Sequence, residues 1–334
     1  MLKRALVDSG VTIDADADVA VHYGYAELFR PLPGKWNVLF SMYESPYLSP
    51  GFITALRMAD QVVVPSRYCA ELFARHTDRP IDVCPLGVDR RVFRPRARRW
   101  NKEAGERFRW LYVGAPNYRK ITILPELYAA LLRDLPCELY IKTTGAMRSP
   151  ELLEQFDPWA CEIFDEGQIV RSYNWTIDNR YLPQAELVDL YHSAHGFLFL
   201  HCGEGFGLTG LEAMATGLAP VISDSTGTRE YADATCAYPV LASVKPVRQK
   251  NAAGEEFVQE LPWPDAIATM RAVGDVMTEY DEARRRGGRA VRRAAAFSWG
   301  EAARRLCVVA AKAGILGPSN VHGSCGPRPQ ITSR

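Results

Sequence analysis

Residues 196–217 place an apolar strand, a glycine-rich turn and a helix in direct succession. The strand is GlyPheLeuPheLeu (196–200), the turn contains Gly205 and Gly207, and Glu204 and Glu212 stand eight residues apart around it. The N–H groups at a helix start are free and carry the positive end of the helix dipole, so such a turn suits phosphates. A carboxylate on either side can hold sugar hydroxyls. The stretch therefore predicts an α/β fold that binds a nucleotide diphosphate sugar.

Length and composition are consistent with a two-domain enzyme. A chain of 334 residues predicts about two domains, and a net charge of +1 gives no reason to expect a nucleic-acid partner. The eight cysteines are scattered without a Cys-x-x-Cys pair, which indicates reduced thiols and a cytoplasmic protein. The N-terminus does not resemble a signal peptide, and no apolar run approaches the roughly 18 residues of a membrane span.

Strands and helices alternate along the first part of the chain, as in parallel α/β sheets. Strands are predicted at residues 17–23, 36–42, 61–65 and 81–85, with helices after Gly51 and after Ser66, a predicted N-cap. Residues 89–109 then carry eight arginines around Pro95. We interpret this segment as a solvated linker; contact with anionic lipid headgroups is the alternative.

The second part repeats the alternation. Strands are predicted at residues 109–114, 137–142, 196–200 and 219–223, with a short helix at 185–192 and helical sequence from Asp265 to about Ala296. Residues 241–262 are polar and predict a surface excursion. The glycine-, serine- and proline-rich stretch from Gly317 predicts disorder.

Several motifs in order resemble the retaining GT-B glycosyltransferases of group 1, glycosyltransferase family 4. ProLeuGlyValAsp (85–89), followed by Phe93 and Pro95, resembles the family's passage out of its first domain. TyrValGlyAlaProAsnTyrArgLys (112–120) is similar to its phosphate loop, residues 204–222 match its Glu-x7-Glu signature, and PheSerTrp (297–299) precedes its closing helix.

The resemblance implies a GT-B fold, with two Rossmann-like domains facing a cleft and an incomplete N-terminal domain. The expected parts are an acceptor-side domain (1–97), a linker (98–106), a donor-binding domain (107–297), a closing helix returning to the first domain (298–314) and a disordered tail (317–334). Because the first domain is short compared with the second, we expect it to lack the first strand and the acceptor loop of its relatives, either through truncation or as a compact variant. We expect the open sheet edge to need covering, for which an oligomer is one candidate.

The resemblance also implies site roles. Glu212 would hold the ribose hydroxyls, and Glu204 would contact hydroxyls of the transferred sugar. Fixed cations and helix N–H groups would stabilise the charge that develops on the departing phosphate, so no metal or other cofactor is expected. The expected donor-binding set is Gly114, Arg119, Lys120, Glu204, Gly205, Phe206, Gly207, Leu208 and Glu212.

Each role has a structural alternative. Thr209-x-x-Glu212 could be a capping box, which would make Glu212 a purely local feature. Glu204 could be a solvated loop carboxylate. Arg119 and Lys120 could be surface charges, although cations are unfavourable at a helix start unless an anion is present. Ala115 stands where relatives often carry a basic residue, and we expect Arg119 to replace it.

The catalytic group of the first domain is less clear. Relatives often place a histidine after the strand equivalent to 36–42, where this chain has Glu44 as the nearest functional group. Lys142, at a strand end, is interpreted as a core-edge lysine reaching water. The Asp-x-Asp pattern at residues 14–18 lacks the neighbours a metal-binding glycosyltransferase would need, so no metal is predicted. The expected catalytic set is Glu204, Lys120, Arg119 and Glu44.

These observations predict a metal-independent, retaining hexosyltransferase-type enzyme that uses a nucleotide sugar. A truncated or non-catalytic relative that binds nucleotide sugar without transfer is the main alternative, and a related phosphorylase or epimerase is a third. The acceptor could be a glycan, a lipid or a small molecule, with peripheral membrane contact as an added expectation. The donor base and sugar cannot be read from these residues.

Overall fold

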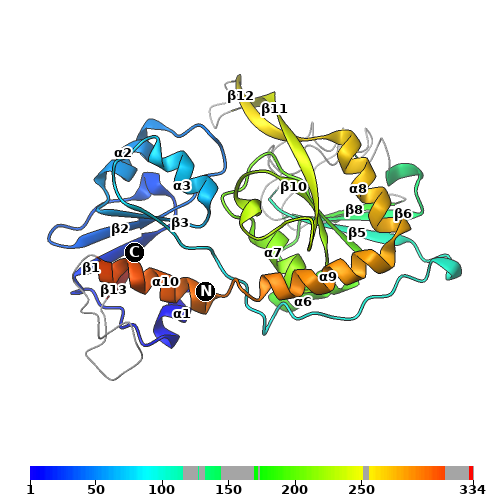
Figure 1. Ribbon diagram of the computed structural model, residues 1–334, viewed down its shortest axis with the longest axis horizontal. Helices are drawn as coiled ribbons and strands as arrows, with labels where there is room; N and C mark the ends of the chain where they lie inside the picture. Colours follow the sequence, from blue (N-terminus) through cyan, green and yellow to red (C-terminus); the bar gives the residue numbers. More distant parts are fainter. Residues whose placement is uncertain are drawn as a thin grey trace. The chain divides into compact units, whose positions relative to one another are not determined.

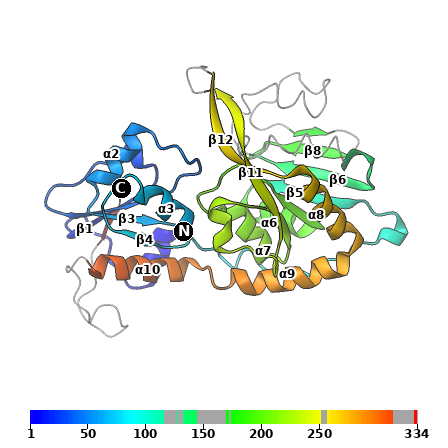
Figure 2. The ribbon, with the colours of Figure 1, turned by 45° about the horizontal axis from the view of Figure 1, so that its top comes forward.

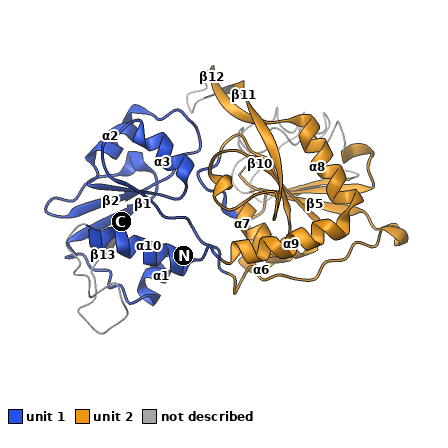
Figure 3. Cartoon of the chain, in the orientation of Figure 1, with its two compact units in different colours: residues 1–89, 204–208, 296–334 blue, residues 90–203, 209–295 orange. Residues whose placement is uncertain are grey.

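The computed structural model describes residues 1–115, 127, 132–143, 169–171, 174–250, 256–312 and 331–333. Contacts divide the chain into two compact units (Figure 3). Unit 1 comprises Met1–Asp89, Glu204–Leu208 and Ala296–Arg334, and unit 2 comprises Arg90–Gly203 and Thr209–Ala295. The glycine turn therefore belongs to unit 1, although the strand before it belongs to unit 2.

Unit 1 is built on a five-stranded parallel sheet in the order β13-β1-β2-β3-β4 (Figure 1). The strands are β1 (Val19–Tyr23), β2 (Trp36–Phe40), β3 (Gln61–Val64), β4 (Ile81–Val83) and β13 (Ile331–Ser333). The helices are α1 (Leu2–Asp8), α2 (Pro50–Met58), α3 (Arg67–Ala74) and α10 (Trp299–Lys312), with a 3₁₀ turn, η1 (Ala26–Leu28).

Helices cover both faces of this sheet. Leu39, Val62 and Val64 share a core with residues of α2 and α3. On α10, the Ala302 carbonyl accepts a bond from the Cys84 thiol just after β4, and α10 packs against α1. The predicted cap is confirmed, since Ser66 Oγ accepts from the N–H of Cys69 at 3.3 Å.

Unit 2 has an eight-stranded sheet in the order β12-β11-β10-β9-β5-β6-β8-β7. The strands are β5 (Phe108–Val113), β6 (Cys137–Lys142), β7 (Ile169–Arg171), β8 (Trp175–Asp178), β9 (Gly196–Phe199), β10 (Pro220–Asp224), β11 (Tyr238–Lys250) and β12 (Glu256–Pro264). The described helices are α6 (Gln184–Ser193), α7 (Leu208–Ala215), α8 (Ala266–Thr278) and α9 (Tyr280–Ala294), with 3₁₀ turns η2 (Lys102–Ala104), η3 (Leu132–Asp134) and η4 (Thr226–Glu230).

Strand β9 shows why the sequence here is a continuous apolar run. Leu198 and the following Leu200 join the core that includes α8, while Phe197 packs against Tyr191 of α6 with ring centroids 5.6 Å apart. A strand buried on both faces needs apolar residues at every position. The prediction of parallel strands is confirmed for unit 1 and for the strands of unit 2 from β11 to β8. The edge strands β7 and β12 of unit 2 pair antiparallel with their neighbours.

Some segments differ from expectation. Residues 241–262, predicted as a polar surface excursion, lie mostly in β11 and β12, which pair antiparallel and extend beyond the rest of the sheet in Figure 2. Exposure on both faces explains their polar composition. The helical stretch from Asp265 is two helices, and the edge of β1 is paired by the chain's own residues 331–333. Among the described residues, no helix is long and apolar enough to span a bilayer.

Candidate functional site

A cavity of about 380 Å³ opens at the carboxyl ends of β5 and β6 in unit 2. Ligands of open α/β sheets bind beyond the carboxyl ends of the strands, so this location is the expected one. The cavity lies where the starts of α6 and α7 approach the two strand ends. Its lining residues are Phe93, Val113, Gly114, Ala115, Lys142, Thr143, Tyr181, Leu182, Gln184, Leu187, Thr209 and Glu212.

Glu212 contributes the carboxylate of this cavity. The hydroxyl of Tyr191 donates to Glu212 Oε2 at 3.0 Å, and burial raises the pKa of Glu212 to about 7. Burial also raises the pKa of Tyr191 well above its ordinary value, so that the hydroxyl keeps its proton. A carboxylate with one protein partner can still accept bonds from a ligand at its other oxygen.

The capping-box alternative does not describe Glu212. Helix α7 begins at Leu208, so Thr209 lies inside the helix rather than at its N-cap. Glu212 accepts its bond from Tyr191 of a different helix, and the same hydroxyl lies 3.3 Å from the carbonyl oxygen of Thr209. The carboxyl group is therefore held by packing between α6 and α7.

The glycine turn is built into unit 1. Ser66 Oγ donates to the Gly205 carbonyl oxygen at 2.7 Å, and a Cβ on Gly205 would lie 2.8 Å from the Cβ of Met42. Gly207 has a φ of +86°, a conformation that favours glycine. Phe206 between them is fully buried near Phe297, at 6.2 Å between ring centroids. The structure thus explains each residue of Gly-Phe-Gly separately: Gly205 by close packing, Phe206 by burial and Gly207 by its positive φ.

Glu204, at the start of the turn, is only 4% exposed. A solvated loop carboxylate would be largely exposed, so that alternative is wrong. Glu204 therefore belongs to the packed interior of the turn.

The sequence comparisons point to one family. Residues 167–306 match the model of the "Family 4 Glycosyltransferase in conflict systems". The resemblance to family 4 glycosyltransferases is confirmed. No curated protein sequence matches the chain.

Solved structures of glycosyltransferases share the fold. A glycosyltransferase from Rickettsia africae is 13% identical, with a TM-score of 0.65 over 95% of this chain and 82% of that one. Sucrose-phosphate synthase from Thermosynechococcus elongatus is 17% identical, with a TM-score of 0.64 over 89% and 74%. HepE from Anabaena, solved with UDP and glucose, is 12% identical, with a TM-score of 0.61 over 83% and 72%. At such identities the likeness establishes the fold, and this chain has the GT-B fold.

The structure separates the predicted site residues into three groups. Gly114 and Glu212 line the same cavity of unit 2. Unit 1 contains a second group: Glu44, Glu204, Gly205, Phe206, Gly207 and Leu208. Arg119 and Lys120 lie outside the described residues, so their predicted phosphate role stays a prediction. Glu44 is half-buried in the loop after β2.

The prediction that Lys142 reaches water is wrong. Lys142 is 3% exposed, and its ammonium group donates to the carbonyl oxygens of Thr143, Asp178 and Arg180. Burial lowers the pKa of Lys142. Its ammonium group therefore ties the end of β6 to the segment leading to Tyr181, on the wall of the cavity.

Asp178 and its partners reinforce this wall, and no local sequence pattern indicates them. Asp178 is fully buried and accepts from the Tyr140 hydroxyl at 2.7 Å and from Arg180 Nη2 at 2.8 Å. Burial opposes ionisation, but these hydrogen bonds prevail and hold the pKa of Asp178 at about 2. The network depends on β6 lying beside β8, which the sequence did not predict.

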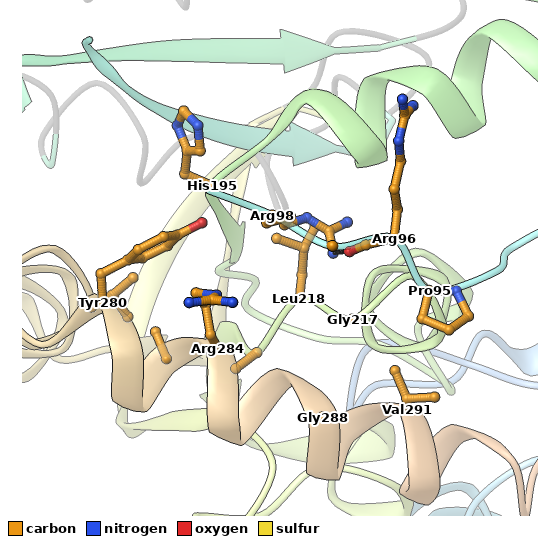
Figure 4. A pocket seen from close by; sticks show the side chains of 14 residues that line it. Pro95, Arg96, Arg98, His195, Gly217, Leu218, Tyr280, Arg284, Gly288 and Val291 are labelled. Atoms are coloured by element: carbon orange, nitrogen blue, oxygen red, sulfur yellow. Dashed lines mark hydrogen bonds between the residues drawn. The ribbon is translucent and has the colours of Figure 1, made fainter. Parts of the chain in front are cut away.

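A second cavity in unit 2, of about 270 Å³, lies between residues 95–98, the turn at Gly217 and α9 (Figure 4). Three arginines line it, but Arg284 bonds to Asp281 on its own helix, and Arg96 extends away from α9 in Figure 4. Arg98 is buried and bonds to main-chain carbonyls. The predicted linker therefore supplies a buried side chain to unit 2, and the cavity near Glu212 remains the better substrate site.

Proposed function

We propose that the chain is a retaining glycosyltransferase that moves a sugar from a nucleotide diphosphate sugar to an acceptor hydroxyl. The observation that carries this proposal is the Glu212 carboxyl group, held by Tyr191 in a cavity at the carboxyl ends of β5 and β6. A carboxyl group with a raised pKa in such a cavity is typical of a functional site. The alternative, a relative that binds nucleotide sugar without transfer, shares this cavity.

The donor would be bound in parts. Glu212 would accept hydrogen bonds from the ribose hydroxyls, and Gly114 would let the diphosphate approach the end of β5 closely. Glu204 would accept from hydroxyls of the transferred sugar. HepE, which shares the fold, was solved with UDP and glucose, and this favours a uridine donor as the first to be tried.

Transfer would break the bond between the anomeric carbon and the diphosphate oxygen. The acceptor oxygen would form the new bond from the same face, and its proton would pass to the departing phosphate. The negative charge that develops there would be stabilised by Arg119, Lys120 and the N–H groups around Gly207. We propose no metal ion, because these groups together can supply the positive charge. Glu44 would orient the acceptor hydroxyl.

Exposed aromatic side chains in unit 1 suggest where the acceptor binds. Tyr23 is the last residue of β1 and Tyr25 follows it, while Tyr47 lies in the loop after β2; Tyr25 is 76% exposed. Ser49 donates to Glu27, which ties these two loops together. A flat apolar ring with a hydroxyl suits the surface of a sugar. We therefore favour a glycan or glycoside acceptor.

A donor panel tests the proposed function. Purified protein is first screened by thermal shift with UDP-, GDP- and ADP-sugars, and then incubated with the stabilising donor and candidate glycosides. Mass spectrometry should detect a product heavier by one sugar residue, and NMR of its anomeric signal should show retention. Binding without hydrolysis or transfer across the panel would favour the non-catalytic alternative, and inversion would reject the retaining mechanism.

A further inference from the structure

Tyr191 is contacted from several sides. Its ring is fully buried, with the ring of Phe93 at 5.8 Å and nearly perpendicular, and the ring of Phe197 at 5.6 Å. Its hydroxyl holds Glu212, and its carbonyl oxygen accepts from Arg98 Nη2 at 2.9 Å. Two of these contacts come from residues 93 and 98, on the segment through which the chain enters unit 2.

Arg98 connects the ends of two helices. Its Nε donates to the carbonyl of Ala194 at 3.1 Å and its Nη2 to that of Tyr191, both at the C-terminal end of α6. Its Nη1 donates to the carbonyl of Thr216, directly after α7, and its Nη2 lies 3.2 Å from Thr216 Oγ1. The guanidinium fork thus binds both helix ends together.

The charge of Arg98 fits this location. The last carbonyls of a helix lack partners within the helix and carry the negative end of its dipole. A guanidinium group offers five N–H donors in a fixed plane, enough to bond to two helix ends at once. Two helix ends together therefore stabilise a buried cation. Among the described residues, Arg98 bonds to carbonyl and hydroxyl oxygens and to no carboxylate.

The opposite ends of the same helices line the donor cavity. Gln184 and Leu187 belong to the first half of α6, and Thr209 belongs to the first turn of α7. Glu212 lies one turn further along α7 and lines the same cavity. A rigid helix transmits a shift at one end to the other. Fixing the C-terminal ends therefore fixes the separation of the two helix starts, and with it the Tyr191–Glu212 hydrogen bond.

We propose that Arg98 is a positioning residue for donor binding, which sets the location and ionisation of Glu212 through Tyr191. Arg98 does not line the cavity near Glu212, so it acts through another residue rather than on the donor itself. The effect on donor binding rests on the proposed function, while the effect on Glu212 does not. Lys142 and Tyr181 are the other ionisable side chains lining the described part of that cavity.

The first experiment needs no ligand. The carboxyl carbon of Glu212 is followed by NMR across pH and identified by its disappearance in Glu212→Gln. Tyr191→Phe removes the hydrogen bond to the ionised form and should raise the titration midpoint by about one pH unit. Arg98→Lys keeps the charge but loses the fork, and should shift the midpoint in the same direction by a smaller amount.

A matched control separates positioning from general destabilisation. Arg286 is a partly buried arginine of α9 that donates to the carbonyl of Ala237, away from α6 and α7. Arg286→Lys should leave the Glu212 midpoint unchanged. If Arg98→Lys lowers the melting temperature without moving the midpoint, Arg98 is only structural. Should Arg98→Lys fail to fold, Thr216→Val loosens the same contact more mildly and is subject to the same criterion.

The second experiment measures nucleotide affinity by calorimetry, with UDP, GDP and ADP as probes. For the nucleotide that binds the wild type, Arg98→Lys should raise the dissociation constant about fivefold. In a Tyr191→Phe background the same substitution should have little further effect. Equal losses in both backgrounds would show that Arg98 does not act through Tyr191. If no nucleotide binds the wild type, the proposed function fails, and the NMR titration still decides the positioning role.

Discussion

Glu204 and Glu212 belong to one short sequence motif but sit in different structural surroundings. Glu204 opens a turn that packs in unit 1, where Ser66 and Met42 contact the neighbouring Gly205. Glu212 projects from α7 in unit 2, where Tyr191 holds its carboxyl group. The first residue is fixed by a turn whose glycines have no room for side chains or need a left-handed backbone. The second is fixed by the packing of two helices.

The difference indicates that the two glutamates of the motif have separate roles. If the proposed function holds, the carboxylate of unit 1 acts on the transferred sugar, and the carboxylate of unit 2 acts on the ribose. Loss of either residue should then affect different parts of the donor. Comparing UDP with UDP-glucose, which differ only by the glucosyl group, is the direct way to test the division.

The largest effect is expected for Glu204→Gln. The substitution keeps the size of the side chain but weakens its bonds to sugar hydroxyls, so transfer from UDP-glucose should fall about a hundredfold. The dissociation constant of UDP, which lacks the transferred glucosyl group, should stay within about twofold of wild type. Steady-state rates and calorimetry provide the two values. If Glu204→Gln weakens the binding of UDP and UDP-glucose equally, Glu204 does not act on the transferred sugar alone.

Glu212→Gln should produce the opposite pattern. Loss of a charged hydrogen-bond acceptor for the ribose should weaken UDP binding about tenfold. The melting temperature should not fall, because a buried carboxyl group is replaced by a neutral amide of the same shape. Calorimetry with UDP and a thermal melt check both statements. Unchanged UDP affinity would return Glu212 to a purely structural role.

The strands of the sheets and the glycine turn could be predicted from the sequence. An apolar run such as residues 196–200, ending at a glycine turn, is typical of a strand buried on both faces, and Ser66 before an amphipathic stretch predicts a cap. These features depend on neighbours along the chain. Gly205 and Gly207 were visible for the same reason.

The supporting contacts could not be predicted in this way. Tyr191 precedes Glu212 by 21 positions, and their hydrogen bond exists because α6 packs on α7. A run of arginines is usually exposed, so the sequence predicts a solvated linker at Arg98, whereas the structure buries this side chain. Lys142 was expected to reach water, but the carbonyls that bind its ammonium group come from β8 and its following turn as well as from Thr143. Contacts between distant segments carry no local sequence signal.

Gly207→Ala tests whether the turn of unit 1 depends on backbone shape. At a φ of +86° a Cβ is strained, and the substitution should lower the free energy of unfolding by about 1 kcal/mol. Thermal or denaturant unfolding measures the change. Gly274→Ala is the control, because that helical glycine has open space around it and no positive φ. It should be neutral or stabilising. Equal destabilisation by both substitutions would contradict the strain argument.

The smallest expected effect is the pH dependence of Glu212. Burial raises its pKa from 4.5 to about 7, so between these values the unfolded chain has released a proton that the folded protein retains. The contribution of Glu212 to stability is therefore complete below pH 4.5 and declines as the pH rises to about 7.

Binding should respond in the opposite direction. Ribose hydroxyls donate more strongly to an ionised carboxylate, so UDP affinity should rise about threefold between pH 6 and pH 8. Calorimetry at intervals across this range measures the change, with corrections for buffer protonation. Glu212→Gln should abolish the rise, whereas Glu204→Gln should keep it, because the glutamate of unit 1 does not touch the nucleotide in the proposed complex. A rise that persists without Glu212 would assign the titration to another group.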